Sequence, residues 1–281
     1  MDDRSILRTW LMRMTVHLIP TEDFGWMAPL FAERTAAYAA RRLEALGASA
    51  GQRDRGLAAV RRALKREGAL TRSAAMDAAG AAGFPVSIQT RTQLVVLLVA
   101  GGDACIGPDR GRESVLVPTG DWIGEPQRRD RDESLAELAR RYLAAFAPAS
   151  DRDFAFWSGL PLRDCRAGLR RIAGEIEELR VAGGGSVLVP RGASARAPRP
   201  PVVRLLGAYD TYLMGYASRR HAADEAVERQ ILPGGGVLRP TICVDGRFAG
   251  TWSNTRSVGR LLIALQPSEP LPRVIVHPLD A

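Results

Sequence analysis

The sequence is poor in cysteine, histidine and lysine: 281 residues include three cysteines, three histidines and a single lysine, Lys65. Cys105, Cys165 and Cys243 stand far apart, with no Cys-x-x-Cys pair and no histidine close by. This spacing predicts neither a disulfide framework nor a zinc site. We therefore expect no metal and no cofactor, and a reducing location such as the cytoplasm.

Long hydrophobic runs are also absent. The longest, over residues 94–100, is far shorter than the roughly 20 apolar residues that a membrane-spanning helix needs. The N-terminal residues do not show the charged, apolar and cleavage regions of a signal peptide. We expect no membrane span and no targeting segment.

Arginine is abundant. Lys and Arg total 39 against 31 Asp and Glu, for a net charge of +8. Clustered guanidinium groups neutralise phosphates and release counterions, so this balance favours a polyanionic partner such as nucleic acid. A GC-rich genome would produce the same wealth of Ala, Arg and Gly, and the charge alone leaves both explanations open.

The middle of the chain contains a repeat at an offset of 79 positions. Equivalent pairs include Arg61 and Arg140, Leu64 and Leu143, Thr71 and Ser150, and Gly80 and Gly159. In each copy the pattern predicts an amphipathic helix, a hydroxyl N-cap, a second helix that a glycine ends, and a third helix. Asp153 follows Ser150 as an acidic capping box. The third helices are predicted over residues 90–100 and 162–179.

A predicted β-hairpin follows each third helix. Residues 105–106 and 115–117 flank a turn-rich segment in the first copy, and residues 187–189 are expected to pair with residues 202–206 in the second. Three helices and a hairpin are the winged-helix order, in which the third helix can enter the major groove and the hairpin tip contacts the DNA backbone. Arginines mark both expected tips: Arg110 and Arg112, then Arg191, Arg196 and Arg199. Solvated loops without a ligand are the alternative.

The two ends of the chain differ from the repeat. Residues 5–13 are expected to be a helix that runs into a strand over residues 15–19, as in the last third of another winged-helix unit. After residue 210 strands are predicted over residues 241–244, 247–252 and 274–276. The sequence thus predicts an α+β fold of tandem winged-helix units. Its expected parts are residues 1–50, a remnant of a first unit; 51–130 and 131–206, a second and a third; and 207–281, a β-rich segment.

One segment carries a family resemblance. Arg8-Thr9-Trp10-Leu11-Met12-Arg13-Met14-Thr15-Val16-His17-Leu18 resembles the Arg-Thr-x-x-Met-Arg-Gly-Thr-x-His-Leu segment of the AlkZ-like winged-helix DNA glycosylases. Residues 153–160, residues 205–216 with Arg219, and residues 231–236 resemble further motifs of that family in the same order. The likeness covers nearly the whole chain. Met14 stands where the family usually has Gly, and Ala217-Ser218 precedes Arg219 where an Asp-Arg pair is common.

The resemblance implies a winged-helix body that grips double-stranded DNA and hydrolyses the glycosidic bond of alkylated or crosslinked purines. The family's catalytic Gln-x-Gln or Gln-x-Asp motif is expected upstream of the segment with which this chain begins, and Gln89 and Gln93 do not match it. Excision therefore stays open. Because Lys65 and the terminal amine are the only amines, any excision is expected to use water, as in a monofunctional glycosylase. A winged-helix regulator or architectural DNA binder, or a protein-interaction body, are the alternatives.

The candidate DNA-binding residues are Arg13, His17, Arg110, Arg112, Arg191, Arg196, Arg199, Tyr212 and Arg219. Asp210 is a minor catalytic candidate, since a carboxylate can stabilise an oxocarbenium-like transition state. A structural salt bridge from Asp210 to Arg219 is the favoured interpretation. Trp157 is expected to pack in a core, and Gly234-Gly235-Gly236 to form a turn. The sequence does not determine the oligomeric state.

Overall fold

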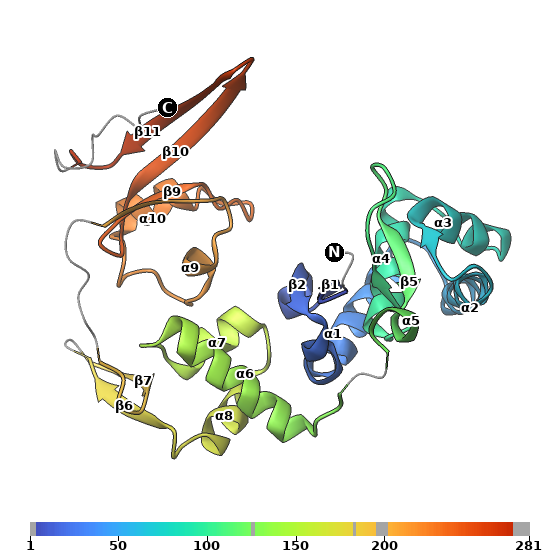
Figure 1. Cartoon of the computed structure of the whole chain (residues 1–281), viewed down its shortest axis with the longest axis horizontal. Coiled ribbons are helices and arrows are strands. Elements are labelled where there is room, and N and C mark those ends of the chain that lie inside the picture. The colour runs from blue at the N-terminus through green and yellow to red at the C-terminus, as the bar shows by residue number, and fades with distance from the viewer. Residues whose placement is uncertain (1–3, 125–126, 182–183, 195–201, 272–281) are drawn as a thin grey trace. The chain divides into compact units, whose positions relative to one another are not determined.

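The computed structural model describes residues 4–124, 127–181, 184–194 and 202–271 (Figure 1). The chain forms two compact units, which we describe separately. The N-terminal unit comprises Met1–Arg140 and Ser158–Ile172, and the C-terminal unit comprises Arg141–Trp157 and Ala173–Ala281. Within the described ranges, no helix combines the length and the apolar character that crossing a membrane requires. The α+β class is confirmed, while the four-part division stays a prediction.

The N-terminal unit contains a five-stranded sheet of order β2-β1-β4-β5-β3. Its strands are β1 (Ile6–Trp10), β2 (Val16–Pro20), β3 (Leu70–Thr71), β4 (Ala104–Ile106) and β5 (Val115–Pro118). The helix predicted over residues 5–13 is wrong. Residues 6–10 form a strand because their backbone pairs with β2 on one side and with β4, far along the chain, on the other.

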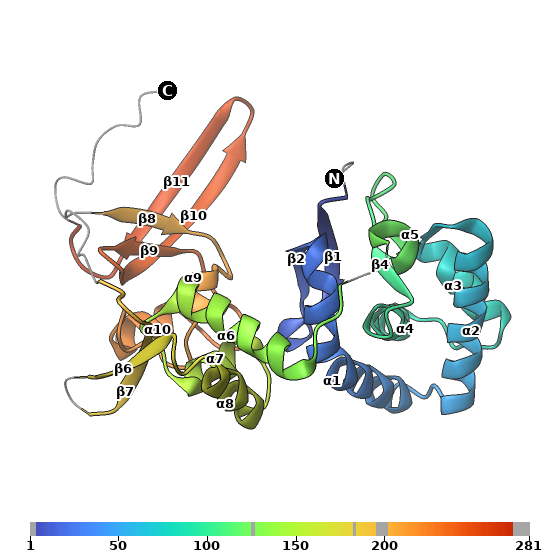
Figure 2. The same cartoon turned by 60° about the horizontal axis from the view of Figure 1, so that its bottom comes forward.

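The helices of this unit are α1 (Phe24–Ala45), α2 (Ala50–Glu67), α3 (Arg72–Ala81), α4 (Ile88–Ala100) and α5 (Thr119–Ile123). The N-cap predicted at Thr71 is confirmed, since its hydroxyl accepts the N–H of Ala74 at 3.2 Å. The order α2, β3, α3, α4, β4, β5 is that of a winged helix, and these elements lie together in both views (Figures 1 and 2). Residues 107–114 join β4 to β5 and form its wing.

The third helix of this winged helix, α4, is buried in its C-terminal half. All six residues from Leu94 to Val99 are buried in one core cluster with residues of α2 and α3, while α1 packs along the same helix. Ile88, in the first turn, is 78% exposed. Gln89 is also exposed, and Arg91, Thr92 and Gln93 are half-buried, so the N-terminal half of α4 is the part open to a groove of DNA.

The second copy of the repeat contains α6 (Arg131–Phe146), α7 (Asp151–Ser158) and α8 (Leu162–Arg171). The acidic capping box is confirmed: the Ser150 N–H donates to Asp153 Oδ2 at 2.9 Å, and the Asp153 N–H donates to Ser150 Oγ at 3.2 Å. Gly168, in the middle of α8, allows a close approach to α6, because a β-carbon there would overlap the carbonyl oxygen of Leu135.

Two predictions about the second hairpin are wrong. The helix predicted over residues 162–179 ends at Arg171, and β6 (Ile176–Arg180) follows it. The strand β7 (Ser186–Pro190) pairs with β6 and not with residues 202–206. The physical reason is that β7 forms a five-residue antiparallel ladder with the strand that directly precedes it.

The C-terminal sheet has the order β11-β10-β9-β8. Its strands are β8 (Val203–Leu206), β9 (Thr241–Val244), β10 (Arg247–Ser257) and β11 (Arg260–Pro267). The helices α9 (Thr211–Met214) and α10 (Glu225–Ile231) contribute Leu213, Val227 and Ile231 to its core. The strand predicted over residues 241–244 is confirmed, β10 continues beyond the predicted residue 252, and the predicted strand over residues 274–276 lies outside the described residues.

Candidate nucleic-acid interface

The segment that carries the family resemblance folds as the β1–β2 hairpin, with Thr9 opposite His17. The Thr15 hydroxyl donates to the Met12 carbonyl at 3.0 Å, and His17 Nε2 lies 2.8 Å from Thr15 Oγ1 and 3.2 Å from the Met12 oxygen. Because the hydroxyl proton is used, Nε2 carries the proton that His17 donates. Burial lowers the pKa of His17, which favours its neutral form. In this structure His17 closes the hairpin turn.

The turn itself has an unusual backbone. Arg13 (φ 52°, ψ 24°) and Met14 (φ 58°) both adopt the left-handed conformation. Residues with a β-carbon disfavour this region by roughly 1–2 kcal/mol each, whereas glycine does not. A glycine at the position of Met14 would therefore relieve strain, which gives a physical reason for the glycine that the related segment usually carries. The strained turn presents the side chain of Arg13 next to Gly159.

The wing of the N-terminal unit displays the charges expected of it. Arg8 Nη2 donates to the Gly107 carbonyl at 3.0 Å and to Asp109 at 2.5 Å, which ties β1 to the base of the wing. Hydrogen bonds from Arg8 lower the pKa of Asp109, and hydrogen bonds from Ser73 lower the pKa of Glu113. Since both carboxylates are engaged, the exposed Arg110 and Arg112 leave the wing with a positive tip.

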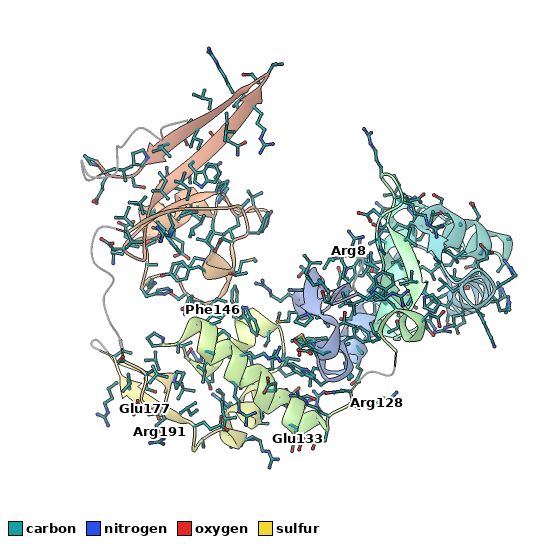
Figure 3. All side chains as sticks on the ribbon, in the orientation of Figure 1. Arg8, Arg128, Glu133, Phe146, Glu177 and Arg191 are labelled. Carbon is teal, nitrogen blue, oxygen red and sulfur yellow. The ribbon has the colours of Figure 1, made fainter. Side chains whose placement is uncertain are left out.

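The second expected arginine tip is not a hairpin tip. Arg191 lies at the base of the β6–β7 hairpin, where Nε donates to the Gly174 carbonyl at 3.0 Å and Nη2 to the Ile176 carbonyl at 3.2 Å (Figure 3). At the opposite end of the hairpin, the Val181 N–H donates to the Gly185 carbonyl at 3.2 Å. Arg196 and Arg199 fall outside the described residues. The assignment of Arg191 to a wing tip is therefore corrected.

Asp210, Tyr212 and Arg219 have three separate roles in the C-terminal unit. Asp210 Oδ1 accepts the N–H of Tyr212 at 2.9 Å and caps α9, while the Tyr212 hydroxyl donates to the Gly246 carbonyl at 2.8 Å. Arg219 is 8% exposed, and its Nε donates to the Leu213 carbonyl at 2.7 Å. The predicted salt bridge to Asp210 is wrong. The carboxylate that pairs with Arg219 is that of Glu228, whose Oε1 lies 3.5 Å from Nη1 of Arg219.

An aromatic cluster surrounds Trp157, as predicted. Its ring centroid lies 5.1 Å from that of Tyr142 and 5.7 Å from that of Phe146. Phe146 also contacts Tyr216 edge to face. These contacts confirm a packing role for Trp157.

The sequence interpretation missed a row of arginines on α8. Arg163, Arg166 and Arg170 are spaced three and four residues apart, which places them on one face of the helix, and all three are exposed. Cys165 and Leu169 are buried on the other side. The periodic spacing of these arginines is the sequence signal that identifies this face. In the winged-helix order α8 is the third helix of its copy, and its arginine face is exposed from Arg163 to Arg170, whereas α4 is open only in its N-terminal half.

A Gln-x-Asp spacing, also missed, occurs at Gln52-Arg53-Asp54 near the start of α2. Gln52 Oε1 accepts the N–H of Ser49 at 2.9 Å in a capping box, and Asp54 pairs with Arg53 at 2.9 Å. Gln52 thus acts in helix capping, and Asp54 acts in a surface ion pair. Among the described residues, no three His, Cys, Asp or Glu side chains gather as metal ligands.

Comparisons with known proteins agree with this architecture. A sequence model of the family described as "DNA glycosylase AlkZ-like" matches residues 1–275. The interstrand DNA cross-link repair glycosylase of Streptomyces sahachiroi is 27% identical over 267 residues, which cover 89% of this chain and 71% of the relative. The solved structure of Streptomyces sahachiroi DNA glycosylase AlkZ matches with a TM-score of 0.77 at 25% identity, over 96% of this chain and 76% of that structure.

Proposed function

Because the chain belongs to the AlkZ-like DNA glycosylase family, we propose that it binds double-stranded DNA through its winged-helix elements, including duplexes with alkylated or crosslinked purines. The crosslinked substrate comes from the relative, whose name specifies interstrand DNA cross-link repair, and the alkylated purines come from the family resemblance. We place this activity in the cytoplasm, which the three buried free cysteines support.

The open arginine face of α8 is the observation that carries the proposal. A helix that presents guanidinium groups once per turn can follow a groove of DNA while its apolar side stays packed. Asp164, which lies between these arginines in the sequence, accepts a hydrogen bond from Arg131 at 2.9 Å and lies 3.5 Å from Arg163. Its charge is thereby compensated, and the face stays positive.

The wing at residues 107–114 supplies a second contact. Arg110 and Arg112 are exposed at a turn whose carboxylates are already hydrogen-bonded. Arginines on a hairpin tip suit phosphate contacts, which position a protein on the duplex without reading its sequence. Arg196 and Arg199 stay proposed contacts, and so do Arg13, His17, Arg191, Tyr212 and Arg219.

Base excision is a separate activity and needs its own measurement. The single lysine favours a water nucleophile over a Schiff base if a base is released. The one Gln-x-Asp spacing noted above caps a helix, so the proposal of DNA binding does not depend on it.

The test is fluorescence anisotropy of a labelled duplex of about two helical turns, titrated with the 281-residue chain at several salt concentrations. We expect micromolar or tighter binding that weakens steeply with salt, because each phosphate contact releases counterions. Equal affinity for plain and crosslinked duplex would favour the regulator or architectural alternative. An absence of binding at low salt would overturn the proposal in favour of a protein-interaction body.

A further inference from the structure

A hollow of about 360 Å³ lies beside the strained turn of the N-terminal unit, which we call the α1 hollow. Two elements face each other across it: the helix α1, and the turn that follows β1 together with Gly159. The residues that matter for its chemistry are Arg13, Met14, Phe31, Arg34, Tyr38 and Arg41.

The wall formed by α1 is a regular row of side chains. Arg34, Tyr38 and Arg41 are spaced four and three residues apart, so they project from one face of the helix. All three are exposed, whereas Thr35 and Ala39, between them in sequence, are buried. The row therefore stands at the mouth of the hollow and not in the core.

The opposite wall is held rigidly. Arg13 and Met14 keep their left-handed backbone through the hydrogen bonds from Met14 N to Leu11 O and from Thr15 N to Met12 O, both 3.1 Å. Gly159 lies against Arg13 without a side chain that would fill the space. Backbone strain of this kind collects at ligand sites, where the surrounding structure maintains it.

The charge of the hollow is of one sign. Three of its lining residues are arginines, and no lining residue is acidic within the part of the chain that the structure describes. Its apolar floor includes Leu11 and Phe31, which are 1% and 4% exposed. Three guanidinium groups around an apolar floor attract an anion and repel a cation such as an N7-alkylated purine.

We propose that the α1 hollow binds a backbone phosphate of the DNA, with Arg34 and Arg41 as its principal ligands and Tyr38 against the adjoining deoxyribose. This inference rests on the proposed function and identifies a specific subsite for it. The volume exceeds a bare phosphate group and accommodates a phosphate with part of its sugar. A positively charged wall excludes the lesion base itself, so the hollow anchors the strand and does not hold the modified purine.

The first experiment compares two double variants in the anisotropy assay. Arg34→Ala/Arg41→Ala removes the wall of the hollow, and Arg42→Ala/Arg62→Ala removes the same charge from exposed positions that do not line it. We expect about a ten-fold loss of affinity for the first variant and a log–log salt slope flatter by about 0.9 for each phosphate contact removed. The control should stay near the wild-type value.

The second experiment locates the phosphate on the DNA. Duplexes carrying a single neutral methylphosphonate at successive positions should weaken wild-type binding at one main position, and the Arg34→Ala/Arg41→Ala variant should be insensitive at that position. Unchanged affinity and salt slope in that variant, or equal sensitivity of both proteins at every position, would overturn the proposal. Matching melting temperatures would establish that both double variants are folded.

Failure of the proposed function gives a different result. If the wild-type chain binds no DNA, inorganic phosphate is the probe, and thermal melting is the measurement. A phosphate-dependent rise in melting temperature that Arg34→Ala/Arg41→Ala abolishes and Arg42→Ala/Arg62→Ala keeps would assign the hollow to a free phosphate. If phosphate does not raise the melting temperature of the wild type, the proposal that the hollow binds a phosphate is overturned.

Discussion

Gly159 stands directly against Arg13: a β-carbon at Gly159 would lie 3.0 Å from Arg13 Cγ and 3.2 Å from its backbone nitrogen. The glycine also has φ +73°. Two independent constraints thus exclude a side chain where the end of α7 meets the turn that follows β1. The contact joins two segments of the family resemblance that are far apart in sequence.

Gly159→Ala should lower the free energy of unfolding by about 3 kcal/mol, because it combines an unfavourable positive φ with steric overlap. Gly47→Ala is the matched control, since Gly47 has φ +85° but nothing within 4 Å of an added β-carbon. It should cost only about 1 kcal/mol. Chemical denaturation measures both, and equal losses would mean that the contact with Arg13 has no energetic role.

His17 should make stability depend on pH. Its pKa is lowered by burial from the ordinary value of 6.5, so the unfolded chain binds a proton at a higher pH than the folded one. Stability is therefore complete above that value and falls as the pH drops from 6.5 toward the folded pKa. Burial also lowers the pKa of His221, which acts in the same direction.

Thermal melting between about pH 7.5 and 5.5 tests this expectation. His17→Gln should flatten the fall, and His221→Gln should flatten it independently. A His17→Gln variant with the full wild-type pH dependence would contradict the role assigned to His17 in the hairpin turn.

Arg163→Ala/Arg170→Ala should weaken DNA binding by about ten-fold and reduce its salt dependence, because two charged contacts to the duplex are lost. The control is Arg66→Ala/Arg229→Ala, which removes the same charge from side chains that are 70% and 73% exposed. Anisotropy titrations of both variants decide the matter. Equal losses of affinity in both variants would mean that the arginines of α8 act on DNA binding only through the net charge of the protein.

Arg219→Met should destabilise the C-terminal unit by about 2–4 kcal/mol, since it removes a buried hydrogen bond to the Leu213 carbonyl and leaves Glu228 without this partner. Arg220→Met, at the exposed neighbouring position, should be near neutral. Denaturation and anisotropy are measured on the same samples. A fully stable Arg219→Met variant with lost DNA affinity would instead identify Arg219 as a direct DNA contact.

The local features were predictable from the sequence because they depend on a few adjacent residues. The caps at Thr71 and Ser150 require only a hydroxyl group a few residues before the N–H that it accepts. Asp245 and Gly246 form the turn between β9 and β10, the two strands predicted on either side of it, and both residues have positive φ. The repeat of helices and hairpins, and with it the winged-helix interpretation, followed from such signals.

Pairing across the chain was not predictable in the same way. Residues 6–10 form a strand because they pair with β2 and β4. The strand β7 pairs with β6 and not with β8, and β8 pairs with β9. Each choice depends on the relative energies of alternative ladders, which no local pattern contains. The same distinction applies to the arginines. Their abundance and spacing are properties of the sequence. The burial of Arg219, and the position of Arg13 beside the same hollow as Arg34 and Arg41, arise from packing.

The sequence by itself determined the basic charge, the N-caps at Thr71 and Ser150 and the family resemblance, because these reside in composition and short motifs. Only the tertiary structure decided how much of each third helix stays exposed. That outcome depends on α1 packing over α4, a contact between apolar surfaces distant in the chain, while the arginines of α8 stay exposed.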